Sequence, residues 1–163
     1  MAFTETHTTT IDNLLLAMMG MKGLFSIHPQ RKKQGVALVV QNPSLTLTKL
    51  KELPERFLKA TVSALGKMPI TVAVIYSPAD SSHERTTFFQ QLQPDLSDIN
   101  LLLGDFNCVI QEEDRSLPLA HWSDSLSLRE ALVAAELVDA LLPGSPHTFT
   151  SPSSYTTRLN RVY

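Results

Sequence analysis

The chain has 163 residues, of which 43% are hydrophobic and 18% charged, and this fits a single globular domain with a buried core. The formal net charge of −2 provides no overall basic footprint for nucleic acid, although a local basic groove can coexist with such a total. The lone cysteine, Cys108, excludes an internal disulfide, and the first apolar run, 14–21, is too short for a membrane span and lacks a basic flank. We therefore expect an intracellular protein without membrane contact.

Hydrophobic patterning divides the first half of the chain into one helix and several strands. Residues 11–25 have helical periodicity, and residues 36–40 form a β-branched run that indicates a buried strand. Residues 58–64 alternate apolar and polar side chains, and residues 70–76 follow after a Gly-Lys-Met-Pro turn, which predicts a hairpin. The stretch 42–55 is mixed and interrupted by proline, so no regular element is predicted there.

The second half alternates helices and strands. Helices are expected at 83–96 and 126–142, and strands at 99–103, 147–150 and 158–163. Because strands outnumber helices and come partly as hairpins, the pattern favours sheets packed face to face with helices outside over a doubly wound parallel sheet.

The most informative segment follows the strand that begins at Leu101. This strand ends abruptly in Gly104, Asp105, Phe106 and Asn107, which leaves an acid and an amide at its carboxyl end, where ligands gather in layered α/β proteins. Two residues apart, their side chains are expected on the same side of an extended chain. Together they offer a carboxylate for a metal or a water, and an amide that can donate to a phosphate oxygen.

Six segments occur in an order that resembles the endonuclease/exonuclease/phosphatase superfamily. They are Glu5-Thr6-His7, 35–40, 74–78, Arg85 with Phe88-Phe89, 104–107 and 158–163. Within this superfamily, the chain resembles most the endonuclease domain of non-LTR (LINE-type) retrotransposons, a subgroup whose pattern also fits 137–140 and 148–151. The resemblance covers essentially the whole chain, and six motifs in order are far more specific than one four-residue motif alone.

This resemblance implies a four-layered α/β sandwich over residues 1–163 and phosphodiester cleavage of DNA that depends on Mg²⁺ (or Mn²⁺). Glu5 matches the family's metal-binding glutamate, and Tyr76 the tyrosine that contacts the scissile phosphate. Asp105 matches the aspartate that orients or deprotonates the attacking water, and Asn107 the asparagine that supports the phosphate and metal environment. The resemblance also implies nuclear action and a parent element that carries a reverse-transcriptase domain.

The chain departs from the family pattern in three places. Asn160 stands where the closing strand has an aspartate, so we expect it to be at most a neighbour of the site. The strand that precedes Glu5 in the family, and the Ser-Asp-His strand that follows beyond Tyr163, are not in the sequence. The expectation is a partial domain with impaired cleavage. A non-catalytic remnant that binds nucleic acid or a partner is one alternative, and a phosphatase branch of the superfamily is a lower-ranked one.

Other polar clusters have simpler interpretations. The acids at 112–114 suggest a metal site, but a solvated loop with Asp114 paired to Arg115 is the better prediction. The basic run 31–33 is interpreted as a solvated turn. Cys108 follows a buried strand and is expected to be a small apolar filler rather than a nucleophile.

Overall fold

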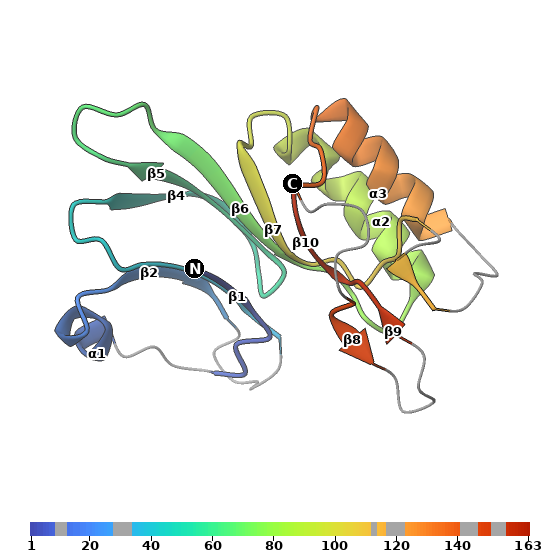
Figure 1. Ribbon diagram of the computed structural model, residues 1–163, viewed down its shortest axis with the longest axis horizontal. Helices are drawn as coiled ribbons and strands as arrows, with labels where there is room; N and C mark the ends of the chain where they lie inside the picture. Colours follow the sequence, from blue (N-terminus) through green and yellow to red (C-terminus); the bar gives the residue numbers. More distant parts are fainter. Residues whose placement is uncertain (9–12, 28–33, 112–113, 117–122, 141–146, 151–155) are drawn as a thin grey trace. The chain divides into compact units, whose positions relative to one another are not determined.

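The computed structural model describes residues 1–8, 13–27, 34–111, 114–116, 123–140, 147–150 and 156–163 (Figure 1). The chain divides into two compact units. The first unit contains residues 1–76 and 99–104, and the second contains residues 77–98 and 105–163. The basic run 31–33 and two of the three acids at 112–114 lie outside the described residues.

The first unit contains two β-sheets built largely from antiparallel pairs. One sheet has the order β1-β3-β2, with β1 at Ala2–Thr4, β3 at Val36–Val40 and β2 at Lys22–Ser26. In the other, the strands of this unit follow the order β7-β6-β5-β4, with β7 at Leu101–Asp105, β6 at Ile70–Tyr76, β5 at Phe57–Ser63 and β4 at Thr46–Leu53. The predicted strand 36–40 and the predicted hairpin of β5 and β6 are therefore confirmed.

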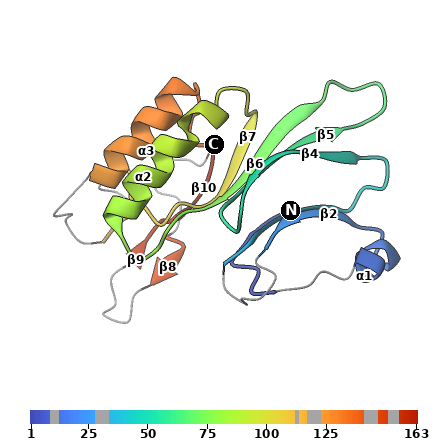
Figure 2. The ribbon, with the colours of Figure 1, turned by 180° about the vertical axis from the view of Figure 1, so that it is seen from behind.

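The core of the first unit lies between these two sheets (Figure 2). Alternate residues of the strands face it because side chains project to opposite faces of a strand with a period of two. The buried cluster consists of Val36, Leu38, Leu58, Ala60, Val72, Val74 and Tyr76. Each fully buried aliphatic side chain contributes about 1.5–3 kcal/mol, so this cluster fixes the end of β6 against β3.

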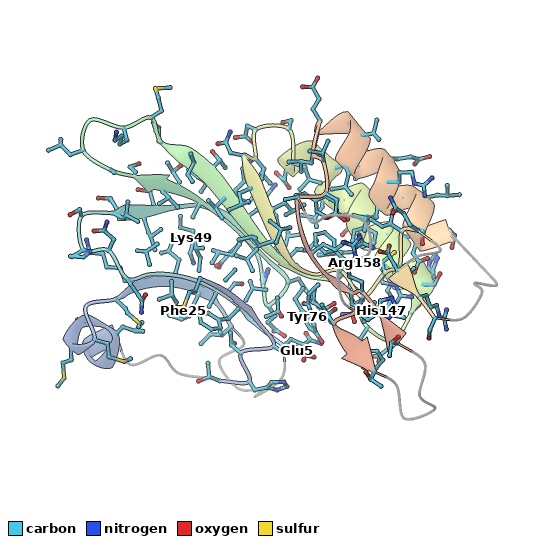
Figure 3. The ribbon with its side chains drawn as sticks, in the orientation of Figure 1. Glu5, Phe25, Lys49, Tyr76, His147 and Arg158 are labelled. Atoms are coloured by element: carbon cyan, nitrogen blue, oxygen red, sulfur yellow. The ribbon has the colours of Figure 1, made fainter. Side chains whose placement is uncertain are left out.

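Side chains join the neighbouring edges of the two sheets. The Lys22 ammonium donates to the carbonyl oxygens of Pro43 and Leu45 at 2.8 and 3.0 Å. The Lys49 ammonium donates to Phe25 O at 3.5 Å (Figure 3). The strand pairing of β4 shifts at Lys49, where Leu50 bulges out of register. Lysines and a bulge on an edge strand oppose pairing with another chain.

In its described residues, the second unit contains two helices, a short 3₁₀ helix and three short strands. These are α2 at Ser82–Leu92, η1 at Gln93–Asp95, α3 at Ser123–Ala134, β8 at Phe149–Thr150, β9 at Thr156–Thr157 and β10 at Asn160–Val162. Ser81 caps α2 by accepting from the Glu84 N–H at 3.3 Å, as in a capping box. Helices α2 and α3 pack on each other. No helix in the described ranges is long and apolar enough to cross a membrane.

Two predicted helices are too long. Helix α1 covers Asn13–Met18, and Gly20 ends it in a left-handed conformation (φ 69°), so 22–26 becomes strand β2 instead of helix. Helix α3 ends at Ala134 because Glu136 is left-handed (φ 56°) and the Leu137 N–H returns to Leu132 O at 3.0 Å. This is a Schellman ending without its usual glycine, so the sequence carries no stop signal. Residues 141–142 lie outside the described part.

The prediction of no regular element at 42–55 is wrong, because β4 occupies Thr46–Leu53. The strand is exposed along most of its length and bulged at Leu50. An edge strand with a bulge has no clean alternation of apolar and polar residues, which is the pattern that identifies a strand from sequence.

Replacement of Gly104 by alanine is expected to destabilise the protein by about 3 kcal/mol. Gly104 has a φ of 146°, and a Cβ atom there would collide with the backbone carbonyl of Ile75. Gly66→Ala is the matched control, since its φ is 70° but nothing lies within 4 Å of a new Cβ, and its cost is about 1 kcal/mol. Urea unfolding of both variants measures the difference, and equal costs would contradict the proposed close approach of β7 to β6.

Candidate functional site

Tyr76 and Glu5 meet in the first unit. Tyr76 is the last residue of β6, and its ring is buried in the core with 5% of the residue exposed. Its hydroxyl donates to Glu5 Oε1 at 2.5 Å, and Glu5 follows directly after β1 (Figure 3). Two residues 71 positions apart in the sequence, both predicted for the site, are thus brought into direct contact.

Three connected turns surround this pair. Their backbones are left-handed at Glu5 (φ 52°), His7 (φ 48°), Gln34 (φ 64°) and Glu55 (φ 65°). The N–H groups of Thr6 and His7 donate to Gly35 O and Gln34 O at 3.4 and 3.3 Å, and the Gly35 N–H donates to Glu55 O at 3.2 Å. Non-glycine residues rarely adopt this conformation, and such strain persists where surrounding structure imposes it, often at functional sites.

Arg56 is a member of this cluster that the sequence analysis missed. Its guanidinium carbon lies 4.9 Å from the centre of the Tyr76 ring, and its Nη1 donates to Tyr76 O at 3.5 Å. The Tyr76 N–H donates to Arg56 O at 2.8 Å. If the pairing of the two hairpin strands is continued by one residue beyond their last pair, Arg56 lies opposite Tyr76. The strand pairing was therefore the signal that could have revealed Arg56.

Asp105 and Asn107 meet in the second unit through a turn. The Asn107 N–H donates to Asp105 Oδ1 at 2.9 Å, and Asn107 has a φ of 45°. The expectation that an extended chain holds them on one side is wrong, because β7 ends at Asp105. Asparagine tolerates the left-handed conformation better than most residues, and an aspartate side chain can hydrogen-bond to a backbone N–H two residues on.

Ser77 fixes this turn from both sides. Its N–H donates to Asp105 O at 3.0 Å, and the Asn107 amide nitrogen donates to Ser77 O at 2.9 Å. Its hydroxyl also donates to Phe106 O, and the Phe106 ring is fully buried. Because an amide nitrogen has two hydrogens, Asn107 retains one for a further acceptor. The carboxylate and the amide are thus held in place before any ligand arrives.

Asn160, the predicted neighbour of the site, lies at the start of β10. It is exposed, and its N–H donates to Thr148 Oγ1 at 3.1 Å, while the Leu159 N–H donates to the same oxygen at 3.0 Å. Thr148 belongs to one of the segments that carried the family resemblance. The Thr148 hydroxyl therefore fixes the backbone of Leu159 and Asn160.

Asp114 corrects the prediction of a solvated acidic loop. The residue is 3% exposed, and its carboxylate pairs with two arginines of the closing segment, not with Arg115. Arg158 lies 2.8 Å from Oδ1, and Arg161 pairs with Oδ2. Asp139 Oδ2 accepts from the same two guanidiniums, at 2.9 and 2.7 Å. Two acids and two arginines thus form a buried network, of which Figure 3 labels Arg158.

Burial opposes the ionised form of Asp114, but its partners outweigh that effect. Hydrogen bonding from the Gln111 N–H and the charges of Arg161 and Arg158 hold the pKa of the carboxyl below its ordinary value. Burial raises the pKa of the nearby Tyr163 phenol above its usual range. Asp114 therefore stays ionised at neutral pH, since both of its oxygens have a guanidinium within hydrogen-bonding distance.

Cys108 has the predicted character of a small apolar filler. It is 2% exposed, and its sulfur lies 3.6 Å from Ser125 Oγ. Burial, reinforced by the negative charge of Asp124, raises the pKa of the Cys108 thiol to about 12. The thiolate needed for nucleophilic chemistry is therefore not formed near neutral pH.

The residues of the first unit fit a hydrated divalent ion. Mg²⁺ takes oxygen ligands and keeps several waters, so one or two carboxylates are enough to anchor it. Glu5 is exposed, and a carboxylate has acceptor positions besides the one that the Tyr76 hydroxyl uses. Within the described part of the chain, no three His, Cys, Asp or Glu side chains converge. The donor set suits a hard ion held by few protein ligands.

Comparison with known proteins finds similarity in structure. No family model matches the sequence. The endonuclease domain of TRAS1, a telomere-specific non-LTR retrotransposon, aligns with a TM-score of 0.66 at 12% identity, over 88% of this chain and 66% of that one. The catalytic domain of Xenopus laevis APE2 gives 0.66 at 16%, over 99% and 72%. An AP endonuclease from Archaeoglobus fulgidus gives 0.62 at 18%, over 81% and 58%.

The chain has the endonuclease/exonuclease/phosphatase fold. The predicted α/β sandwich is therefore confirmed. The chain spans 58–72% of the length of these three structures. At identities of 12–18% the similarity concerns the architecture, so the reaction has to be argued from the residues that this endonuclease/exonuclease/phosphatase fold carries.

The variant Asp114→Asn is expected to lower the free energy of unfolding by about 3–5 kcal/mol at pH 7. It removes the charge between Arg158 and Arg161, and both guanidiniums are buried. Asp80→Asn, at an exposed position, is the control and should change stability by less than about 0.5 kcal/mol. Urea unfolding gives both values, and similar small changes would show that the network adds little.

At acidic pH, the free energies of unfolding of Asp114→Asn and of the unchanged protein should become equal. The folded pKa of Asp114 is lowered, so its stabilisation is complete above the unfolded value of about 3.9 and disappears as the pH falls through the folded value. We expect the difference between the two unfolding free energies to begin to shrink below about pH 4 and to vanish only below the lowered folded pKa of Asp114. Urea titrations between pH 7 and pH 2 test this, and a constant difference over that range would contradict the assigned shift.

The stacking of Arg56 on Tyr76 is expected to contribute about 0.5–1 kcal/mol of coupling free energy. Unfolding of Arg56→Met, Tyr76→Leu and the double variant measures it, because methionine keeps an apolar stem and removes the charge. The cycle of Arg56→Met with Leu65→Ala, a fully exposed side chain, is the control and should give no coupling. Equal coupling in both cycles would argue against a specific contact.

Proposed function

We propose that the chain is a divalent-metal-dependent phosphodiesterase of the endonuclease type that acts on DNA. The observation that carries this proposal is the preorganised Asp105–Asn107 turn, in a chain with the endonuclease/exonuclease/phosphatase fold. The names of the similar structures support a nucleic-acid substrate, since two are AP or retrotransposon endonucleases.

Asp105 serves as the group that orients or deprotonates the attacking water. Its carboxylate is only partly buried, so water can reach it, and one oxygen is already fixed by the Asn107 N–H. A positioned general base contributes about 10²–10⁴-fold to a rate. Asn107 donates its remaining amide hydrogen to a phosphoryl oxygen, where negative charge develops during displacement.

Glu5 is proposed to bind the metal ion, and Tyr76 to donate a hydrogen bond to the phosphate. Glu5 is the residue that would hold Mg²⁺ or Mn²⁺, and the ion would polarise the phosphoryl group and lower the pKa of water. The Tyr76 hydroxyl donates to Glu5, and a phenol in this position can also donate to a phosphate oxygen. Arg56 holds the Tyr76 ring in place and adds positive charge beside it.

A retroelement origin is part of the proposal. The endonuclease domain of TRAS1 supports it, together with the motifs at 137–140 and 148–151. In such an element the nick would leave a 3′-hydroxyl that primes a reverse-transcriptase domain of the same element, and this reaction would take place in the nucleus.

A non-catalytic domain that still binds nucleic acid or a partner is the second candidate function. Asn160 favours it, because an amide stands where the resembling family has a carboxylate, and an amide cannot orient a histidine as an anion does. Phosphatase chemistry on a smaller phosphate ester ranks below both, since no residue of the site selects for it.

Nicking of supercoiled plasmid by the purified chain tests the proposal. We expect nicking with Mg²⁺ or Mn²⁺, none with EDTA, and at least about a 100-fold loss of rate in Asp105→Asn, which keeps the shape of the side chain but cannot act as a base. Asp80→Asn is the matched control and should nick normally. A folded protein that binds plasmid without nicking it would support the second candidate, and nicking that survives in Asp105→Asn would refute the assigned base.

A further inference from the structure

The two units of the chain carry opposite net charges. The first unit has nine Lys and Arg against four Asp and Glu, a net charge of +5. The second has five against twelve, a net charge of −7. The modest total of −2 therefore conceals a strong asymmetry, which is a property typical of chains that bind a charged partner through one part.

Four exposed lysines of the first unit lie on its edge strands β2 and β4 or in the turn after β5. These edge cations are Lys22 on β2, Lys49 and Lys51 on β4, and Lys67 in the turn between β5 and β6. Lys22 and Lys49 belong to the neighbouring edges that their own hydrogen bonds join. Lys67 lies near the start of β4, because Thr46 is paired with Ser63 just before that turn.

Two of these lysines are already fixed. Lys22 donates to two backbone carbonyls, and Lys49 donates to Phe25 O and pairs with Glu52 at 2.6 Å. Hydrogen bonding to a carbonyl keeps the positive charge, and an ammonium has three donors. The Lys22 ammonium is thus anchored on the residues before β4, and the Lys49 ammonium on β2.

We propose that the edge cations bind the phosphate backbone of nucleic acid outside the residues that do the chemistry. The inference rests on the proposed function, because a DNA substrate supplies the regularly spaced anions that a row of lysines along an edge would meet. Lysine suits this role as a point charge, and phosphate contacts fix the position of the substrate without reading its sequence.

Salt dependence of binding tests this surface directly. Fluorescence anisotropy with a labelled DNA duplex of about 25 base pairs, in EDTA so that no strand is cut, gives the slope of log K against log salt concentration. We expect Lys51→Gln and Lys67→Gln each to reduce the magnitude of this slope by about one. Between 50 and 200 mM salt, the affinity of each variant should therefore fall by a factor about threefold smaller than the affinity of the unchanged protein does. Arg129→Gln removes one exposed positive charge from the second unit and should leave the slope unchanged.

The outcomes separate this inference from the proposed function. Reduced slopes in both lysine variants but not in Arg129→Gln support the surface, whether or not the chain nicks plasmid. Equal effects in all three variants would reduce the finding to net charge and overturn it. Unchanged slopes in the lysine variants would also overturn it. If low salt instead drives concentration-dependent self-association, seen by sedimentation velocity and lost in Lys51→Gln, the edge is an interface between copies.

Discussion

The end of strand β6 is the constraint on which the candidate site depends. Tyr76 closes this strand, with its ring in the core and its hydroxyl on Glu5. The next residue, Ser77, donates its N–H to Asp105 O and accepts at its carbonyl oxygen from the Asn107 side-chain amide. Tyr76 thus holds Glu5 in the first unit, and Ser77 holds Asp105 and Asn107 in the second. A slip of β6 by one residue would exchange its core and outer faces and would move the Tyr76 hydroxyl away from Glu5.

Strain is concentrated at the same places. Of the six non-glycine residues with positive φ in the described structure, four belong to the turns around Glu5 and one is Asn107. Each left-handed non-glycine residue costs about 1 kcal/mol or more, and the surrounding hydrogen bonds have to offset that cost. A fold selected for stability alone would use glycine in such turns. Their presence beside a carboxylate and a phenol is physical support for a site, independent of the family resemblance.

The sequence predicted the parts of the fold that obey simple periodicity. The strand 36–40 and the hairpin of β5 and β6 follow from apolar patterning, and helix α2 follows from the apolar side chains Phe88, Phe89 and Leu92 on one of its sides. Apolar patterning does not predict the elements in which local geometry overrides it. Strand β4 is bulged and exposed, and helix α3 ends in a left-handed glutamate, which no sequence rule marks as a stop.

The site was predicted as a set of residues but not as a set of contacts. Family motifs pointed to Glu5 and Tyr76, whereas their hydrogen bond depends on turns that pattern analysis does not describe. Arg56 was missed because a charged residue before a strand usually lies in solvent. Asp114 was misjudged for the same reason, since its partners lie 44 and 47 residues further along the chain and only the tertiary fold brings them together.

The closing segment, residues 156–163, contains both buried residues that stabilise the fold and an exposed residue, Asn160, that was predicted to lie near the site. Arg158 and Arg161 are buried and paired with two acids, and Thr148 holds the backbone between them. Asn160, the residue that differs from the family pattern, is exposed and lies among these anchors. Exchange of a carboxylate for an amide there leaves the buried network intact, so the architecture can persist while the reactivity changes. The effect of position 160 on cleavage is thus a question of chemistry and not of folding.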